Sequence, residues 1–228
     1  MNEMALYYPG GAVPFSAVMS FDVDAENGFT PLCPGELPVP EGHLIADELN
    51  RQATFAKFRG FSKDAHSRNA RWAASEGHPQ LEMISNEPDL DVRWNMHAVV
   101  GEFGHELIGG LPHVREYDFW AVKGTESDMH PYGACYQDLA KRISTGLIEW
   151  ATVKQVRVFL VGGLALEFCV QETVLELLEA GFTVILNLAA TRGIYDNLMQ
   201  DAIEKMKACG AIIINDVGDL QLVENLAT

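Results

Sequence analysis

A cysteine stands where an apolar strand breaks at two glycines and a helix begins. The run VRVFLV at 156–161 is typical of a buried parallel strand, and apolar residues at helical spacing follow as far as Gly181. We therefore expect Cys169 in the first turn of that helix, where unpaired backbone N–H groups and the helix dipole favour thiolate over thiol. Because a thiolate attacks carbonyl carbons, Cys169 is a candidate nucleophile. The alternative is an inert, buried cysteine that packs as a small apolar side chain.

Two charged residues end other apolar runs, Asp22 in MSFDVDAENGF and Lys123 in FWAVKG. Asp24 follows Asp22 and would point to the same side if the strand continued. The carboxyl ends of parallel strands meet at one edge of an open sheet, so Asp22 and Lys123 are expected near Cys169. A carboxylate can take the thiol proton and return it to departing ammonia, while an ammonium group stabilises negative charge. The set predicts amide cleavage, although a lone strand-end aspartate is more often a turn former and a lysine is usually solvated.

A second group of residues could hold a metal ion. Asp64 and His66 stand two apart at the end of a strand-like run, and His97 follows in RWNMHAVV. Three nitrogen and oxygen ligands that leave other coordination positions of the ion open are typical of a catalytic metal site. The ligand types suit Zn²⁺, and also Fe²⁺ or Mn²⁺. The spacing also arises by chance, since a lone histidine is more often a capped or solvated residue. Further histidines without a fixed position are His78, His105 and His113.

Six apolar runs must position these residues: FSAVMSF, FAKFRGF, YDFWAV, VRVFLVG, FTVILNL and AIIIN. Helical spacing appears at 42–51, 138–152, 167–180 and 195–209. This alternation predicts a parallel sheet covered by helices. Segments 27–41 and 67–114 lack periodicity, and loops of that length in a compact domain are usually functional.

Composition limits the possible partners and the location of the protein. The 228 residues contain no Pro/Ser-rich or charge-dense linker, so we expect a single domain over residues 1–228. A formal charge of −16 argues against nucleic acid or an anionic membrane as partner. There is no basic leader followed by a long apolar core, no run long enough to span a membrane, and no C-x-x-C pair. These features predict a cytoplasmic protein.

Five short segments, taken in order, resemble the nicotinamidases of the isochorismatase-like cysteine hydrolase superfamily. FDVDAENGF looks like the D-V-Q-N-D-F segment of that family, SKDAH like its D-x-H, RWNMH like W-P-x-H, VKG like its strand-end lysine segment, and GGLALEFCV like G-x-A-T-D-x-C-V. The resemblance spans about residues 15–195. It implies a three-layer α/β/α sandwich on a mainly parallel six-stranded sheet, with strand order 3-2-1-4-5-6.

The resemblance also implies a reaction, the hydrolysis of nicotinamide to nicotinate and ammonia as in NAD salvage. It assigns Asp22 as general base and acid, Lys123 as electrostatic partner, and Cys169 as the nucleophile that forms a thioester. The backbone N–H groups of Ala165 and Cys169 match the oxyanion hole, with a cis peptide expected between Leu164 and Ala165.

The remaining implied roles concern a metal and a small carboxamide substrate. Asp64, His66 and His97 match the ligands of one divalent metal ion, Zn²⁺ as first choice with Fe²⁺ or Mn²⁺ as alternatives, and in the family this ion meets the pyridine nitrogen. Phe29, Trp94 and Tyr132 match aromatic positions that line the pyridine pocket; alone, such residues are also ordinary packing. A homo-oligomer is compatible with the sequence.

Several positions depart from the family pattern and keep other readings open. The first motif carries extra residues before Phe29, and the remaining departures are Asn95, Ala98, Glu102 and Ala189. Because Asn95 and Glu102 are expected beside the pocket, a related carboxamide is an alternative substrate. Another superfamily amidase need not use the metal, and a non-catalytic metabolite-sensing scaffold would leave Cys169 unreactive. A flavodoxin-like module is disfavoured because no G-x-G-x-x-G follows a strand.

Overall fold

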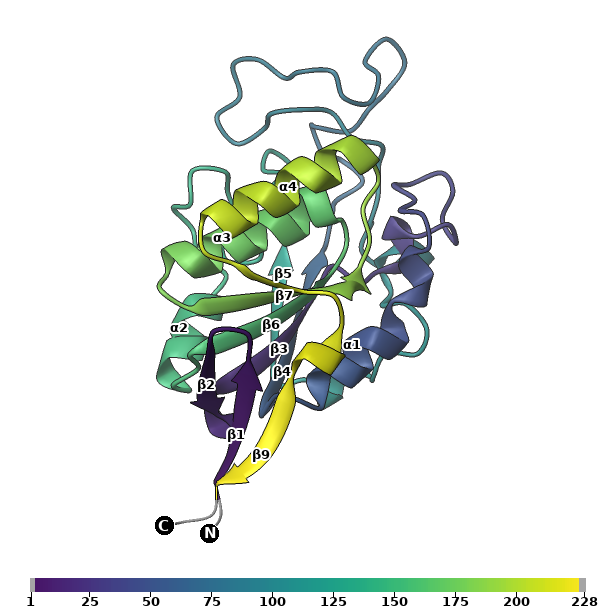
Figure 1. Ribbon diagram of the computed structural model, residues 1–228. Coiled ribbons are helices and arrows are strands. Elements are labelled where there is room, and N and C mark those ends of the chain that lie inside the picture. Colours follow the sequence, from purple (N-terminus) through teal and green to yellow (C-terminus); the bar gives the residue numbers. More distant parts are fainter. Residues whose placement is uncertain (1–2, 226–228) are drawn as a thin grey trace.

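A six-stranded parallel sheet forms the centre of the molecule, of which the computed structural model describes residues 3–225 (Figure 1). From edge to edge the strands are β5 (Phe119–Lys123), β4 (Phe58–Asp64), β3 (Val18–Val23), β6 (Val158–Gly163), β7 (Thr183–Thr191) and β8 (Ile212–Ile214). β6 is buried along its whole length, which is why its sequence is a continuous apolar run. Each strand overlaps a run expected from the sequence, and the strand order 3-2-1-4-5-6 is confirmed.

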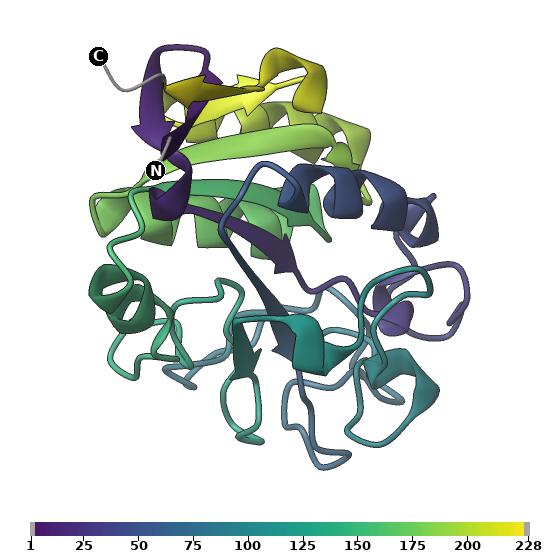
Figure 2. The same cartoon turned by 90° about the horizontal axis from the view of Figure 1, so that it is seen from below.

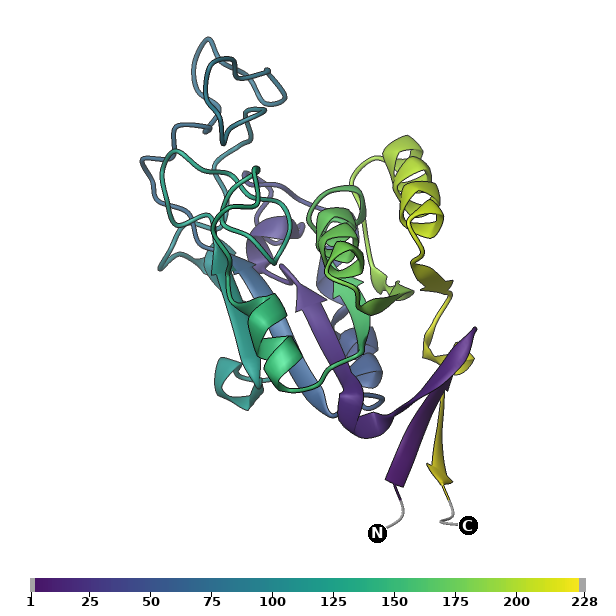
Figure 3. The ribbon, with the colours of Figure 1, turned by 90° about the vertical axis from the view of Figure 1, so that its left-hand side faces the viewer.

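Helices cover both faces of this sheet, as Figures 1 and 3 show. One face carries α1 (Ala46–Ala53), and the other carries α2 (Leu147–Val153), α3 (Gln171–Glu179) and α4 (Asp196–Ala208). Alternate side chains of β3 enter the two layers: Phe21 packs in the core beneath α2 and α3, while Ser20 accepts a hydrogen bond from Gln52 of α1. The predicted three-layer sandwich is therefore confirmed.

Three helix starts differ from the expected ones. The helix expected from residue 42 begins at Ala46, after the 3₁₀ turn Gly42–Leu44. The helix expected from residue 138 begins only at Leu147, because the Asp138 carboxylate accepts the backbone N–H groups of Arg142 and Ile143 and closes a turn instead. Gly146, in the left-handed conformation at φ 90°, then separates that turn from α2. The helix expected from residue 167 starts as one π-helical turn, Leu166–Val170, before α3.

A small antiparallel sheet that the sequence did not indicate closes the amino-end side of the main sheet. It consists of β2 (Gly11–Pro14), β1 (Glu3–Tyr8) and β9 (Gln221–Asn225), in that order. β1 and β9 lie side by side in Figure 2 although they come from opposite ends of the chain. Leu6 and Val13 of this sheet pack against Ile185 and Ile214 in a separate apolar cluster.

Long loops rise from the carboxyl ends of the strands (Figure 3). Residues 65–118, between β4 and β5, form only isolated bridges and two short 3₁₀ turns. Trp72 anchors this segment with a fully buried side chain. The loops cover the edge of the sheet at which the chemistry-bearing residues were expected. Over residues 3–225, no helix has the length and apolarity needed to cross a bilayer.

Candidate active site

Four polar residues meet beyond the carboxyl ends of adjacent strands. Asp64 is the last residue of β4, Lys123 is the last of β5, Asp24 is the first after β3, and Cys169 lies in the π-helical turn after β6. β5, β4, β3 and β6 are consecutive in the sheet and parallel, so their ends lie at one edge. The sequence therefore places these residues together through the strand topology.

Lys123 is the buried cation at the centre of this group. Its Nζ lies 3.0 Å from Asp24 Oδ2, 2.5 Å from Asp64 Oδ1 and 3.9 Å from Cys169 Sγ. Burial acts to lower the pKa of Lys123, but the carboxylates of Asp24 and Asp64 outweigh burial and raise it well above the usual value. Lys123 is therefore a fixed positive charge beside the sulfur, and the solvated alternative for this lysine is wrong.

Cys169 is buried, and its surroundings favour the thiol over the expected thiolate. Burial raises the pKa of Cys169 well above the ordinary value, and the nearby carboxylates of Asp24 and Asp64 also raise it, while Lys123 lowers it. The helix-dipole argument leaves out this burial and the carboxylates of Asp24 and Asp64, which oppose the thiolate. A base is therefore needed to take the proton, and a carboxylate oxygen of Asp24 lies within 4.8 Å of the Cys169 sulfur.

Asp24, not Asp22, is the carboxylate beside Lys123, so the residue predicted as general base lies outside this group. The Asp22 carboxylate lies under the face of the sheet that α1 covers, where it accepts hydrogen bonds from Arg59 Nη2 at 2.7 Å and Tyr117 Oη at 3.0 Å. Asp24 does not continue the strand, because its φ of 43° is left-handed and turns its side chain beyond the sheet edge. There it accepts a 2.6 Å hydrogen bond from Ser62 Oγ.

The sequence contains a signal that identifies Asp24. Read from Asp24, the segment D-A-E-N-G-F has the same length as the family motif D-V-Q-N-D-F and ends at Phe29. This comparison needs no extra residues before Phe29, whereas the comparison from Asp22 does. Motif length therefore favours the residue that the geometry also selects.

Beside Lys123, Asp64 faces the two histidines that were predicted with it. Asp64 Oδ2 lies 3.5 Å from His66 Nε2 and 3.7 Å from His97 Nε2. The Nδ1 atom of His66 is 2.9 Å from the Gly124 carbonyl oxygen, and that of His97 is 2.7 Å from the Asn95 carbonyl oxygen. A carbonyl oxygen only accepts hydrogen bonds, so Nδ1 is the donor in both rings, and in the neutral imidazole the lone pair of Nε2 is then free for a metal ion. The chain thus offers a buried carboxylate and two correctly oriented imidazoles, a donor set that fits a divalent metal ion.

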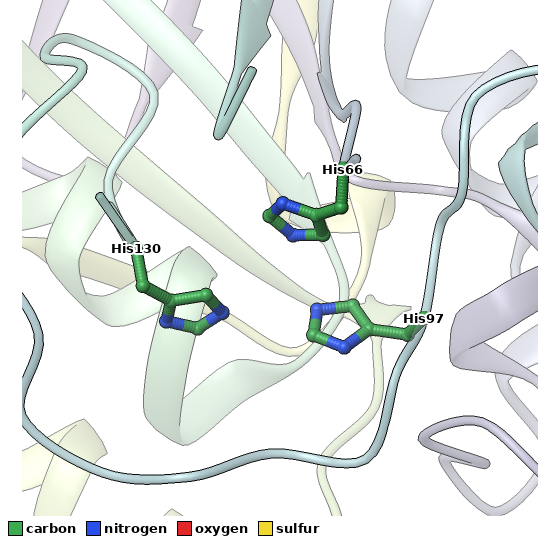
Figure 4. Close-up of side chains that lie close together, drawn as sticks. All are labelled: His66, His97 and His130. Atoms are coloured by element: carbon green, nitrogen blue, oxygen red, sulfur yellow. The ribbon is translucent and has the colours of Figure 1, made fainter. Parts of the chain in front are cut away.

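A third histidine, which the sequence reasoning missed, completes a buried cluster. Figure 4 shows His66, His97 and His130 facing one another, and one nitrogen from each ring lies within 4.8 Å of the other two. His130 comes seven residues after Lys123 in the loop that follows β5. The loop after β5 lies at the same edge of the sheet as Asp64, His66 and His97. This position is the sequence signal that could have identified His130.

A narrow apolar pocket leads to Cys169 and the histidines. The three aromatic residues expected there all line it, and the remaining lining residues are Leu37, Asp64, His97, His130, Ala165, Phe168, Cys169 and Ile194. Trp94 Nε1 donates to Tyr132 Oη at 3.1 Å, and Tyr132 Oη donates to Asp91 at 2.9 Å, so both rings are held in place. Phe29 stands against His97, with the ring centroids 5.2 Å apart.

The backbone next to the nucleophile has the expected conformation. The Leu164–Ala165 peptide bond is cis, as predicted. Ala165 lines the pocket together with Cys169, the two residues whose N–H groups were expected to bind the oxyanion.

Several other residues lie apart from this pocket. Asn95 donates through its side chain to the Glu36 carbonyl oxygen, and Glu102 pairs with Arg68, so neither is among the residues that line the pocket. Of the remaining histidines, His78 pairs with Glu82 at the surface, and His113 caps a 3₁₀ turn. His105 is half-buried, and its burial lowers its pKa to about 4. Asn95 therefore lies beside the pocket only through its backbone carbonyl, which holds the pocket residue His97, and the side chain of Glu102 faces Arg68.

Comparison with known proteins places this geometry among hydrolases. Residues 120–216, which include Lys123 and Cys169, match the isochorismatase domain family. The nicotinamidase of Escherichia coli strain K12 is 30% identical over 200 residues, which cover 84% of this chain and 91% of that protein. The solved structure of the Acinetobacter baumanii nicotinamidase/pyrazinamidase has a TM-score of 0.80 at 25% identity and covers 87% of this chain and 96% of its own. The pyrazinamidase of Pyrococcus horikoshii in complex with zinc has a TM-score of 0.69 at 26% identity. The match covers 87% of this chain and 98% of the pyrazinamidase chain.

Proposed function

The chain belongs to the nicotinamidase family of isochorismatase-like amidohydrolases, and on that premise we propose that it hydrolyses nicotinamide to nicotinate and ammonia through a thioester on Cys169. The observation that carries the proposal is the position of Lys123, buried between Asp24 and Asp64 and 3.9 Å from the Cys169 sulfur. Family membership favours an amidase over the metabolite-sensing scaffold. A cytoplasmic location and a homo-oligomeric state remain predictions.

In the first half of the reaction Asp24 acts as a base. It takes the thiol proton as the Cys169 sulfur bonds to the carboxamide carbon, and the carbonyl oxygen becomes an oxyanion. Lys123 stabilises the negative charge on sulfur as the proton leaves, and the N–H groups of Ala165 and Cys169 receive the oxyanion. Asp24 then returns its proton to the amide nitrogen, the C–N bond breaks, and ammonia departs.

In the second half Asp24 acts as a base again. It takes a proton from a water molecule that attacks the thioester carbon, and the C–S bond breaks. The acid product leaves, and the proton held by Asp24 returns to the sulfur. Because burial raises the pKa of both Asp24 and Cys169, proton transfer between them is better matched than it would be between an ordinary carboxylate and a buried thiol.

We assign Asp64, His66 and His97 as residues that would hold a divalent metal ion, with Zn²⁺, Fe²⁺ and Mn²⁺ as candidates. When bound, the ion would supply a Lewis acid for the pyridine nitrogen of the substrate. Phe29, Trp94 and Tyr132 would hold the aromatic ring between their side chains. The Tyr132 hydroxyl is occupied by Trp94 and Asp91, so this residue contributes its ring face.

Metal content tests the ligand assignment. We expect about one divalent ion per chain in the wild-type protein and a large loss of bound metal in the double variant His66→Ala, His97→Ala, because the variant removes both imidazoles of the assigned site. Elemental analysis after dialysis measures both. The variant His78→Ala, which changes an exposed histidine, should retain the wild-type content. Full occupancy in the double variant, or full activity after complete metal removal, would contradict the assignment.

Substrate comparison tests how the ring is recognised. Benzamide keeps the ring and the carboxamide but lacks the pyridine nitrogen, so its kcat/KM should be about 10- to 100-fold below that of nicotinamide if a polar contact to that nitrogen is lost. Steady-state ammonia release measures both amides. Equal kcat/KM values would remove the pyridine contact from the proposal.

The same assay tests the function itself. Ammonia release should be fastest with nicotinamide and pyrazinamide and slow with unrelated amides. A hollow of about 500 Å³ shares Trp94, Tyr132 and Phe168 with the pocket, which leaves room for an amide with a longer substituent. No turnover of nicotinamide beside efficient cleavage of such an amide would transfer the assignment to the second substrate class.

A further inference from the structure

We propose that His130 is a fourth protein ligand of the metal ion, beside Asp64, His66 and His97. The proposal rests on the metal site assigned above and extends it to a residue from a different loop. The structure would then hold the ion with one carboxylate and three imidazoles, contributed by three separate segments of the chain.

The position of the His130 ring carries the proposal. Its centroid lies 5.5 Å from that of His66 and 5.8 Å from that of His97. One nitrogen of each of the three rings lies within 4.8 Å of the others. Metal–nitrogen bonds of about 2.1 Å place neighbouring ligand atoms roughly 3.4 Å apart. The nitrogen atoms therefore need to approach one another by at most about 1.4 Å to share an ion.

The hydrogen-bonding state of His130 points in the same direction. The side chain is buried, with 4% of its surface exposed, and neither Nδ1 nor Nε2 has a hydrogen-bond partner among residues 3–225. The Nε2 atom of His66 is likewise buried without a partner. A buried polar nitrogen without a partner is costly, and coordination of one ion would satisfy a nitrogen of each ring.

The surroundings fix His130 in this position. Its backbone N–H donates to the Asp89 carbonyl oxygen at 3.0 Å, and the Asp89 carboxylate pairs with Arg142 at 2.6 Å. Trp72 packs against the imidazole, with the ring centroids 4.5 Å apart. Two loops therefore clamp the residue toward the cluster, an arrangement that preorganises a ligand.

The alternative role for His130 is an aromatic wall of the pocket, and two variants separate the roles. His130→Phe keeps a ring against Trp72 but removes the nitrogen atoms, whereas His130→Ala removes both. A ligand role predicts that both variants lose metal affinity to a similar extent. A packing role predicts that phenylalanine retains the affinity of the wild-type protein.

The experiment measures dissociation constants for Zn²⁺ and Mn²⁺ by competition with a chromophoric chelator, on the full chain in the absence of substrate. We expect both His130 variants to bind about 100-fold more weakly than wild type, since even residues that only orient a ligand cost 10- to 100-fold. His78→Ala, a surface histidine outside the cluster, should be unchanged. X-ray absorption on the zinc-loaded proteins should count three imidazoles in wild type and two in His130→Phe. Thermal denaturation of the metal-free forms identifies any variant that has not folded.

The results distinguish failure of this proposal from failure of the metal site. Unchanged affinity in a folded His130→Phe, together with two imidazoles in wild type, would overturn the role of His130 and leave the other three ligands in place. A wild-type protein that binds neither ion would overturn both assignments.

Discussion

Replacing Cys169 with alanine is expected to lower kcat/KM for nicotinamide by about 10⁴-fold or more, because no thioester can form without the sulfur. The fold and metal content should persist, since the side chain is small and alanine fills most of its volume. Ammonia release measures the activity, and mass spectrometry of rapidly quenched wild-type enzyme should find the acyl group on Cys169.

The matched control is Cys135→Ala. Cys135 is also buried and lies beside Glu176 in the core, so its replacement should change activity by only a few-fold. More than a few per cent of wild-type activity in Cys169→Ala would remove the covalent mechanism. An acyl group on another cysteine would relocate the nucleophile.

Replacing Asp24 with asparagine should affect catalysis, whereas replacing Asp22 with asparagine should affect stability. Asp24→Asn is expected to lower kcat by about 10³-fold, because an amide cannot take the thiol proton. Asp22→Asn should leave kcat within a few-fold of wild type but lower the free energy of unfolding by about 3 kcal/mol, since it leaves the Arg59 guanidinium without a charged partner. Steady-state kinetics and urea denaturation together separate the two effects.

The two variants test the choice of base directly, because Asp22 and Asp24 stand two residues apart on one segment and their side chains point in different directions. A large loss of kcat in Asp22→Asn with wild-type stability would restore Asp22 as the base. Wild-type kcat in Asp24→Asn would remove Asp24 from the mechanism, whatever the behaviour of Asp22.

The prediction at this pair failed for a physical reason. Side chains that are two residues apart share a face only while the strand continues, and the assignment used the end of the apolar run as the end of the strand. β3 extends through Asp22 to Val23, so Asp22 remains within the sheet and faces Arg59. The left-handed backbone at Asp24 then directs the next carboxylate toward Lys123.

The protonation of Cys169 and the participation of His130 also depended on tertiary contacts. A helix start favours a thiolate, but burial and the carboxylates of Asp24 and Asp64 act against that tendency, and they come from other strands. His130 gives no local pattern, since its partners His66 and His97 lie far back in the chain. Only folding brings the three rings together.

The sequence by itself determined the parallel sheet and most of the residues that end its strands. The family resemblance added the strand order. Apolar periodicity marks a strand locally, and parallel topology brings strand ends such as Asp64 and Lys123 to one edge without further information. The tertiary structure alone decided which side chains face one another at that edge and which of them are charged. Those properties depend on backbone direction at single residues and on burial by distant segments, and neither is encoded in local spacing.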